Sequence, residues 1–313
     1  MDINKDKNLK IDLDDPIFKK LNINTIEDLT QEKLDEIGRI LTEKRNSTPI
    51  DDFEGYSPMQ MQYLIYNPFD PDSPLQINPN IDDSVLDKIY LLPPLEYLIS
   101  QIKEQSFFKL TEKGNIPPKH VKHITGMYAG EDRFYIRTLK VVKENDSIIT
   151  QLLHIFLELS GIVKKRKNIL TITKSGQSII SDRVTLLKKM IEIIGLRLNR
   201  GYFDAYGNNE VGQIAFGFIF ALVSKYGNDW QHVKFYAEKY FKAFPLLYGQ
   251  AKTGFSSHST PEEQSNSCFN LRMFDRFMVL FNFLDVQVDK KDLLERNKYI
   301  KKSDIFDKIF ILK

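Results

Sequence analysis

The chain has few of the features that mark secreted, membrane or disulfide-bonded proteins. Its 313 residues contain one cysteine, Cys268, so no disulfide can form within the chain, and this favours a reducing compartment. Residues 1–15 are polar and lack the apolar stretch of a signal peptide. No apolar run approaches the ~18 residues that a membrane span needs. We therefore expect a soluble cytoplasmic protein with no membrane partner.

A strong charge of one sign is also missing. The 44 Lys and Arg residues and the 42 Asp and Glu residues leave a net charge of +2, so any electrostatic attraction to nucleic acid must be local. Hydrophobic residues make up 42% of the chain, which is enough to build buried cores. Because 313 residues exceed what one compact core usually covers, we expect two or three folded units.

The motifs of common enzyme classes are missing as well. "GQAKTG" (249–254) has the glycine spacing of a phosphate-binding loop, but Phe255 and Ser256 follow where Lys and Ser or Thr are required. No nucleophile elbow, zinc-protease helix or dinucleotide fingerprint occurs. We interpret Cys268 as a buried or cap-adjacent side chain rather than a reactive thiol, and "AGEDRFY" (129–135) as a loop ion pair rather than an acid–base pair. No cofactor is expected.

Two histidines are the candidates for a metal site. His120 and His123 lie three residues apart on an expected helix, a spacing at which two side chains can share a metal ion. The sequence nominates no further ligand near them. Because Lys119 and Lys122 are interleaved, we interpret both histidines as facing solvent or phosphate, and no metal is expected.

What is present is a clear order of helices and strands. Residues 25–45 read as an amphipathic helix, and Ser57 followed by Pro58 reads as the start of a second helix before a proline-rich loop. From residue 86 the pattern is helix, strand, helix, helix, strand, strand. The corresponding stretches are "LPPLEYLISQIKEQ", "FFKLT", "NIPPKHVKHIT", "SIITQLLHIFLELSG", "GIVKKRK" and "NILTITKSG".

The end of this series carries a family resemblance. "LELSGIV", then a basic turn, then "LTITKSGQSII" is similar to the signature of bacterial winged-helix regulators, in which a third helix leads into GLV, a wing hairpin and LT-x-x-G. The resemblance implies a three-helix domain with a β-hairpin wing, a fold that serves nucleic-acid binding and protein interaction alike. Gly161 fits this plan, because a helix often ends at a residue with positive φ.

A second copy of the same order follows the first. With a shift of 124 residues, "LEYLISQIKEQ" (95–105) falls on "IFALVSKYGND" (219–229), and "LHIFLELSGIV" (153–163) falls on "FMVLFNFLDVQ" (277–287). "VTLLKKMIEIIGLRLNR" between the copies is apolar around most of its girth, which indicates a buried bridging helix. Residues 248–267 have low hydrophobicity and read as a flexible loop before the last helix.

We therefore expect a mainly α protein with short β-hairpins, built of tandem winged-helix-like modules and an N-terminal helical region. The expected domains are residues 1–85, an N-terminal helical region with a proline-rich loop; 86–182, the first module; and 183–313, the bridging helix with the second module.

Basic residues at the first wing and on the last helix are the candidates for nucleic-acid binding. The third helix of the first module has no Arg or Lys, and Asp146 and Glu158 on it would repel phosphate. On the last helix Asp275 is interleaved, so pairing within the chain is an equally good interpretation. The candidate residues are Lys164, Lys165, Arg166, Lys167, Arg272 and Arg276.

Three functions remain open on these grounds. The first is a non-enzymatic protein that binds an unknown protein partner, with a second copy of the chain as another candidate partner. The alternative is a DNA- or RNA-binding regulator that uses the basic wing and the last helix, and the second alternative is an enzyme with no recognisable motif. The protein-binding function predicts an exposed apolar patch on the N-terminal region or along the module interface. DNA binding predicts that the wing cations and Arg272 and Arg276 converge on one face.

Overall fold

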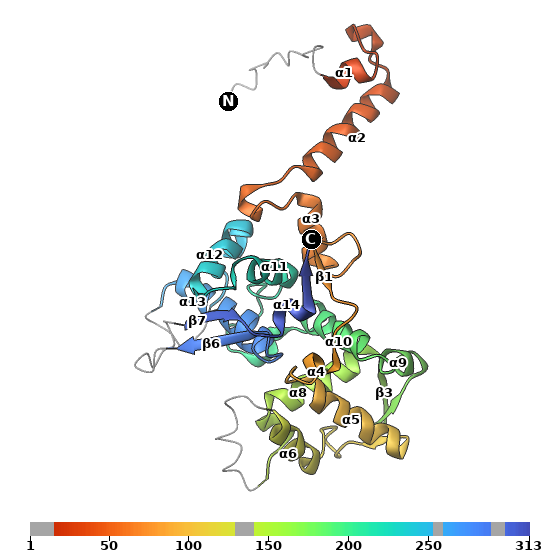
Figure 1. The fold of residues 1–313 in the computed structure, drawn as a ribbon, viewed down its shortest axis with the longest axis vertical. Helices are drawn as coiled ribbons and strands as arrows, with labels where there is room; N and C mark the ends of the chain where they lie inside the picture. The colour runs from red at the N-terminus through yellow and green to blue at the C-terminus, as the bar shows by residue number, and fades with distance from the viewer. Residues whose placement is uncertain (1–15, 129–140, 253–258, 289–297) are drawn as a thin grey trace, which may run out of the picture. The chain divides into compact units, whose positions relative to one another are not determined.

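The computed structural model describes residues 16–128, 141–252, 259–288 and 298–313 (Figure 1). The chain divides into two compact units, unit 1 (Met1–Gln60) and unit 2 (Met61–Lys313). This division differs from the expected boundaries after residues 85 and 182, because β1 (Leu75–Ile77) pairs with β8 (Phe310–Leu312) at the far end of the chain. No helix in the described residues is both long enough and apolar enough to span a membrane.

Unit 1 is helical, and its helix starts follow the capping signals of the sequence. The expected helix over 25–45 forms as two elements, because Thr30 caps a new start by accepting from the Lys33 amide. Ser57 caps α3 and receives the Gln60 amide, as its place before Pro58 predicts. The elements are α1 (Pro16–Lys20), η1 (Ile26–Asp28), α2 (Gln31–Ser47), η2 (Asp51–Phe53) and the start of α3 (Pro58–Tyr66).

The described residues of unit 2 are mainly helical, with three small antiparallel sheets. Its first part contains β1, α4 (Asp83–Leu86), α5 (Leu92–Gln105), β2 (Phe108–Lys109), α6 (Pro118–Met127), η3 (Glu144–Asp146), α8 (Ile148–Ser160), β3 (Val163–Arg166), β4 (Ile169–Ile172), α9 (Lys174–Ile179), α10 (Arg183–Glu192), the π-helix η4 (Ile193–Arg197) and η5 (Arg200–Phe203). Its second part contains α11 (Phe216–Tyr226), β5 (Gln231–His232), α12 (Val233–Ala243), η6 (Pro245–Leu247), α13 (Pro261–Asn270), the π-helix η7 (Leu271–Met278), β6 (Leu284–Val288), β7 (Lys298–Lys302), α14 (Phe306–Ile309) and β8.

The two parts of unit 2 share one order of elements and one strand order. The three-stranded sheets run β2-β4-β3 and β5-β7-β6, so in each the third strand of the sequence lies in the centre. α5 and α11 begin 124 residues apart, the shift found in the sequence, whereas α6 and α12 begin 115 residues apart. The recurrence therefore lies in the order of elements, and loops of unequal length separate them.

Aromatic side chains fill the core of the second part. Phe216, Phe218 and Phe220 on α11 are all fully buried. The Phe220 ring contacts the rings of Phe277, Phe283, Phe306 and Phe310 at centroid distances of 5.0–6.3 Å, which is the range of favourable aromatic pairs. α11 is thus buried on all sides, which explains why its sequence is the most apolar of the chain.

One loop expectation is wrong in part. Residues 248–267 were expected to form a loop, but α13 begins at Pro261. Thr260 accepts from the Glu263 amide (3.2 Å), while the Glu263 carboxylate accepts from the Thr260 amide (2.9 Å). This reciprocal capping box, with proline in the first turn, starts a helix despite the low hydrophobicity around it.

Two glycines allow α8 to turn into the first sheet and the sheet to return to α9. Gly161 ends α8 with φ = 72°, a conformation that costs a side-chain-bearing residue strain. Gly176, in the first turn of α9, lies directly against the backbone of Ile162. A Cβ at Gly176 would overlap the Ile162 carbonyl oxygen, which also accepts the Thr173 amide at 2.9 Å. The final glycine of the LT-x-x-G stretch is therefore a packing requirement.

We predict that Gly176→Ala destabilises unit 2 by about 2 kcal/mol or more, because backbone rather than a movable side chain blocks the added methyl group. Gly126→Ala on α6 is the matched control: nothing lies within 4 Å of its Cβ position, so we expect a gain of about 0.5–1 kcal/mol. Urea denaturation followed by tryptophan fluorescence measures both. Equal effects of the two substitutions would contradict the packing argument.

Candidate functional site

The basic turn of the sequence forms a tight hairpin between β3 and β4. Arg166 pairs with Ile169, so only Lys167 and Asn168 form the turn, and both have positive φ (49° and 58°). This is the turn type that matches the twist of two antiparallel strands. The Asn168 side chain donates to the Glu112 carbonyl (3.0 Å), which fixes the hairpin to the loop after β2. Lys164, Lys165, Arg166 and Lys167 are all exposed.

The strand register sorts these cations onto two faces. Lys165 lies opposite Leu170 on the buried face, where its Nζ pairs with Glu158 of α8 (2.8 Å). Lys164 and Arg166 lie on the other face, opposite Thr171 and Ile169. On the far side of β4, Lys109 of β2 also lies opposite Ile169, so it shares this face.

We call Lys109, Lys164 and Arg166 the basic sheet face. Within the described residues none of the three forms an ion pair, and all are exposed. The sequence did not identify Lys109 as a candidate. Only the strand register, which depends on pairing between distant segments, brings residue 109 beside residues 166 and 169.

α8, which was expected to be the third helix of the first module, does not offer a recognition surface. Ser147, Thr150 and His154 are polar, but each is at most 6% exposed. Ser147 caps α8 by accepting from the Thr150 amide, and the His154 ring lies between Glu144 (2.7 Å) and Glu158 (3.1 Å). α6, β3, η3, α10 and η4 pack around this helix. Its polar side chains are therefore used inside the protein.

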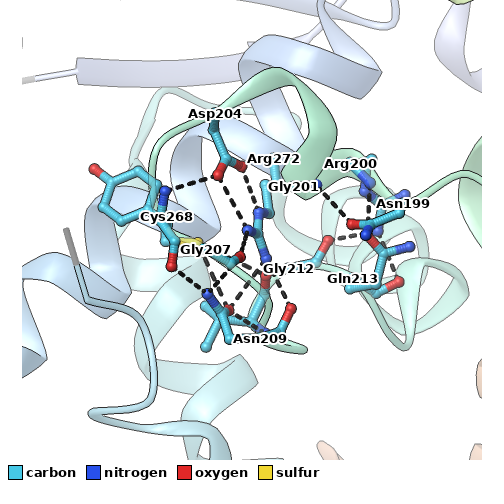
Figure 2. A network of polar contacts seen from close by, with 12 residues as sticks. Asn199, Arg200, Gly201, Asp204, Gly207, Asn209, Gly212, Gln213, Cys268 and Arg272 are labelled. Carbon is cyan, nitrogen blue, oxygen red and sulfur yellow. Dashed lines mark hydrogen bonds and ion pairs between the residues drawn. The ribbon is translucent and has the colours of Figure 1, made fainter. Parts of the chain in front are cut away.

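Arg272 is the main correction to the expected nucleic-acid site. It lies on η7 and is fully buried, so it cannot contact DNA in this structure. Its Nε and Nη2 donate to the two carboxylate oxygens of Asp204 (2.6 and 3.1 Å), a bidentate ion pair (Figure 2). Its Nη1 and Nη2 donate to the carbonyl oxygens of Gly207, Asn209 and Val211 at 3.0–3.1 Å.

These contacts keep Arg272 charged and fix one connection of the chain. Although burial alone favours the neutral form, the hydrogen bonds and charge of Asp204 raise the pKa of Arg272. The segment between η5 and α11 has almost no regular secondary structure, so its carbonyl oxygens need donors from elsewhere. Arg272 supplies donors for three of them.

Arg200, at the start of η5, does the same for the neighbouring backbone. It is 1% exposed, and its guanidinium donates to the carbonyl oxygens of Ile194 (3.2 Å), Gly212 and Gln213 (2.8 Å) without a carboxylate partner in the described residues (Figure 2). Burial lowers the pKa of Arg200 to about 9, which still leaves it charged at neutral pH. The carbonyl of Ile194 lies at the end of α10 and η4, where the helix dipole favours a cation.

The remaining candidates also lie apart from the basic sheet face. Arg276 is half-buried on the same π-helix as Arg272, and the interleaved Asp275 pairs with Lys298 (2.9 Å) rather than with either arginine. Because Arg272 is buried, it does not share an exposed surface with the wing cations. The second wing, over residues 289–297, lies outside the described residues.

The histidine pair packs around one tyrosine. His120 is buried, not solvent-facing as expected, and its Nδ1 lies 2.7 Å from the Tyr97 hydroxyl. His123 is exposed and its ring lies 4.2 Å from the ring of Tyr97. Burial lowers the pKa of His120, which favours its neutral form. The described residues contain no group of three side chains that could hold a metal ion.

Cys268 is fully buried on α13, as the sequence interpretation has it. Burial raises the pKa of its thiol to about 12, so the thiolate that a nucleophile needs is not formed at neutral pH. The acid-rich stretch 129–135 lies outside the described residues.

We predict that Arg272→Met destabilises unit 2 by about 3–5 kcal/mol, because it leaves the buried Asp204 carboxylate without its partner. Arg166→Met, at an exposed arginine, is the control and should change stability by less than about 0.5 kcal/mol. Adding Asp204→Leu to Arg272→Met should recover part of the loss, since both charges are then removed. Urea denaturation measures all three, and a loss for Arg272→Met no larger than the control would contradict this role.

Comparison of the chain with protein-family models, with curated proteins and with solved structures found no match.

Proposed function

We propose that the chain is a non-enzymatic interaction protein built on two winged-helix-like modules in tandem. The recurring order of helix, strand, helix, helix, strand, strand supports the proposal, together with the same strand order in both sheets. Neither third helix presents a basic surface, which directs the interaction elsewhere. α8 exposes no basic side chain, and Ser265, Cys268 and Phe269 of α13 are buried in the core.

One observation favours a protein partner. α2 has 17 residues, and none of them is buried. Leu34, Ile37 and Leu41 follow at spacings of three and four, so they lie on one side of the helix; we call them the α2 stripe. Leu34 is 46% exposed and Leu41 49% exposed. An apolar stripe at this spacing is the form in which helices bind partner proteins.

The charges of α2 indicate a second copy of the same helix as the partner. Its first half, residues 31–38, carries three acidic residues and one lysine, whereas residues 39–47 carry three basic residues and one glutamate. Two copies in antiparallel orientation place unlike halves against each other, while parallel copies place like halves together. In the antiparallel pairing Leu34 of one copy lies near Leu41 of the other. The chain would thereby act as a dimeric scaffold.

A second candidate function is binding to the backbone of duplex nucleic acid through the basic sheet face. The specific observation is that Lys109, Lys164 and Arg166 share one exposed face, with Lys167 at its edge. Neighbouring strands lie ~5 Å apart, and alternate residues along one strand lie ~7 Å apart. The cations therefore span a surface that can contact several phosphates. Because the third helix is buried, such binding would not read base sequence.

For the scaffold we predict a concentration-dependent dimer of the 36.6 kDa chain in sedimentation equilibrium. Leu34→Gln with Leu41→Gln should weaken it at least ~100-fold, since two leucines per copy lose about 1.5–3 kcal/mol of burial each. Thr42→Gln with Asn46→Gln, off the stripe on the same helix, is the control. A monomer at every concentration, or equal dimerisation of both variants, would refute the proposal.

The orientation has its own variants. Lys44→Glu with Arg45→Glu should weaken an antiparallel dimer, because acidic halves would then face each other. Adding Glu32→Lys and Asp35→Lys should restore it. A dimer that the first pair of substitutions leaves unchanged or strengthens is parallel, and the charge argument fails.

For duplex binding we predict a measurable affinity for random duplex DNA at ~50 mM salt that falls steeply as salt is raised. Lys164→Glu with Arg166→Glu should lower the affinity at least tenfold and reduce the logarithmic salt slope by about 2. Lys252→Glu with Lys308→Glu makes the same charge change at exposed lysines elsewhere in unit 2. If no binding is detected at ~50 mM salt, or if the control variant loses as much, this candidate is excluded.

A further inference from the structure

The outer face of the second sheet carries aromatic side chains. β5, β7 and β6 pair so that His232, Tyr299 and Gln287 form one cross-strand row. Lys301 and Asp285 lie opposite each other in the next row, and Trp230 comes directly before β5, two residues from His232. Because alternate residues of a strand point to the same side, these side chains share one face. We call this set of six the aromatic sheet face.

The two aromatic rings of this face are exposed. Trp230 is 41% exposed and Tyr299 39% exposed, both large fractions for aromatic side chains on an ordered sheet. The alternate residues of β7, Ile300 and Lys302, are buried against the core. The Lys301 Nζ lies 5.9 Å from the centre of the Trp230 ring, a cation–π distance. The face therefore presents two rings and a cation on a fixed backbone.

The first sheet has a related feature in the same place. Phe107 comes directly before β2, as Trp230 comes directly before β5, and it is 43% exposed. The basic sheet face lies beside it, with Lys109 two residues on. Both sheets thus combine an exposed aromatic ring at the start of the first strand with cations on the outer face. The first sheet is rich in cations, and the second is rich in rings.

We propose that the aromatic sheet face binds single-stranded nucleic acid. Bases stack on Trp230 and Tyr299, and Lys301 contacts a phosphate. Every base has a π-face, so stacking on aromatic side chains beside a cation binds unpaired strands with little regard to sequence. A duplex hides its bases from such a surface and offers only its phosphates, so it cannot stack on the rings. This site goes beyond the dimer and the duplex surface proposed above, and neither is needed for it.

The polar residues of the face fit unpaired bases better than a protein partner. Gln287 and Asp285 are exposed on β6, beside the rings, and amide and carboxylate groups can bond to base edges that pairing no longer covers. An apolar protein partner would have to bury these groups without partners, which is unfavourable. A carbohydrate could also stack on the rings, so it is one outcome of the test.

The chain has a single tryptophan, which makes the experiment direct. Unstructured oligo(dT) of about 20 nucleotides is titrated into the full chain at ~50 mM salt. Tryptophan fluorescence reports contact at Trp230, and anisotropy of a labelled strand reports binding. We expect quenching that saturates together with the anisotropy change. Trp230→Ala and Tyr299→Ala should each weaken binding about 5- to 150-fold, the range measured for loss of one stacking ring.

Matched variants separate stacking from other causes. Trp230→Phe and Tyr299→Phe keep a ring and should retain most of the affinity, and Tyr202→Ala, at a tyrosine 68% exposed outside the face, should retain all of it. Trp230→Ala should leave duplex binding unchanged, whereas Lys164→Glu with Arg166→Glu should leave the quenching in place. Failure of duplex binding and failure of this site are thereby distinguished.

Three results would overturn the proposal. If oligo(dT) binds but leaves the tryptophan fluorescence unchanged, it binds elsewhere on the chain. No binding at ~50 mM salt, or equal affinity of Trp230→Ala and the unsubstituted chain, excludes stacking at this face. Quenching by a soluble oligosaccharide but not by oligo(dT) assigns the face to carbohydrate instead.

Discussion

The rule that buried backbone carbonyls need donors governs the centre of this protein. The connection from α10 to α11 has little helix and no strand, so its carbonyl oxygens lack the partners that secondary structure provides. Arg200 and Arg272 supply those partners from two sides, with Asp204 as the counter-charge of the second. The position of α11, and with it the aromatic core of the second part, depends on this connection being fixed.

Internal hydrogen bonding also limits which surfaces can bind partners. α8 is enclosed by its neighbours, and its polar groups bond within the protein. The outer side of each three-stranded sheet and the apolar stripe of α2 remain exposed. The two sheets have the same strand order but different outer residues, so one strand order carries two surfaces of different chemistry.

The sequence predicted local structure better than it predicted contacts between distant residues. α5 occupies the predicted stretch, Gly161 ends α8 with positive φ and Pro118 begins α6, because each depends on residues within one or two turns. The partner of Arg272 could not be found in this way: Asp204 is 68 residues away in a stretch without periodicity. Lys109 was missed for a related reason, since strand register is set by the assembled sheet.

The start of α13 shows a different limit. Its capping box was present in the printed sequence at Thr260 and Glu263, but the low hydrophobicity of 248–267 outweighed it in our interpretation. Polar residues at a helix start mark where the helix begins, and a hydrophobicity averaged over twenty residues does not show this. Local hydrogen bonding was therefore a better guide there than composition.

The pairing of β1 with β8 determines how unit 2 would respond to a pulling force. Leu75, where the chain enters β1, lies opposite Leu312, where it leaves β8, so both strands are held from the same end of the ladder. Tension applied there opens the strand hydrogen bonds one after another instead of shearing them together. A translocating unfoldase that grips either strand would meet little mechanical resistance at this sheet, and the aromatic core would be the first barrier to its progress.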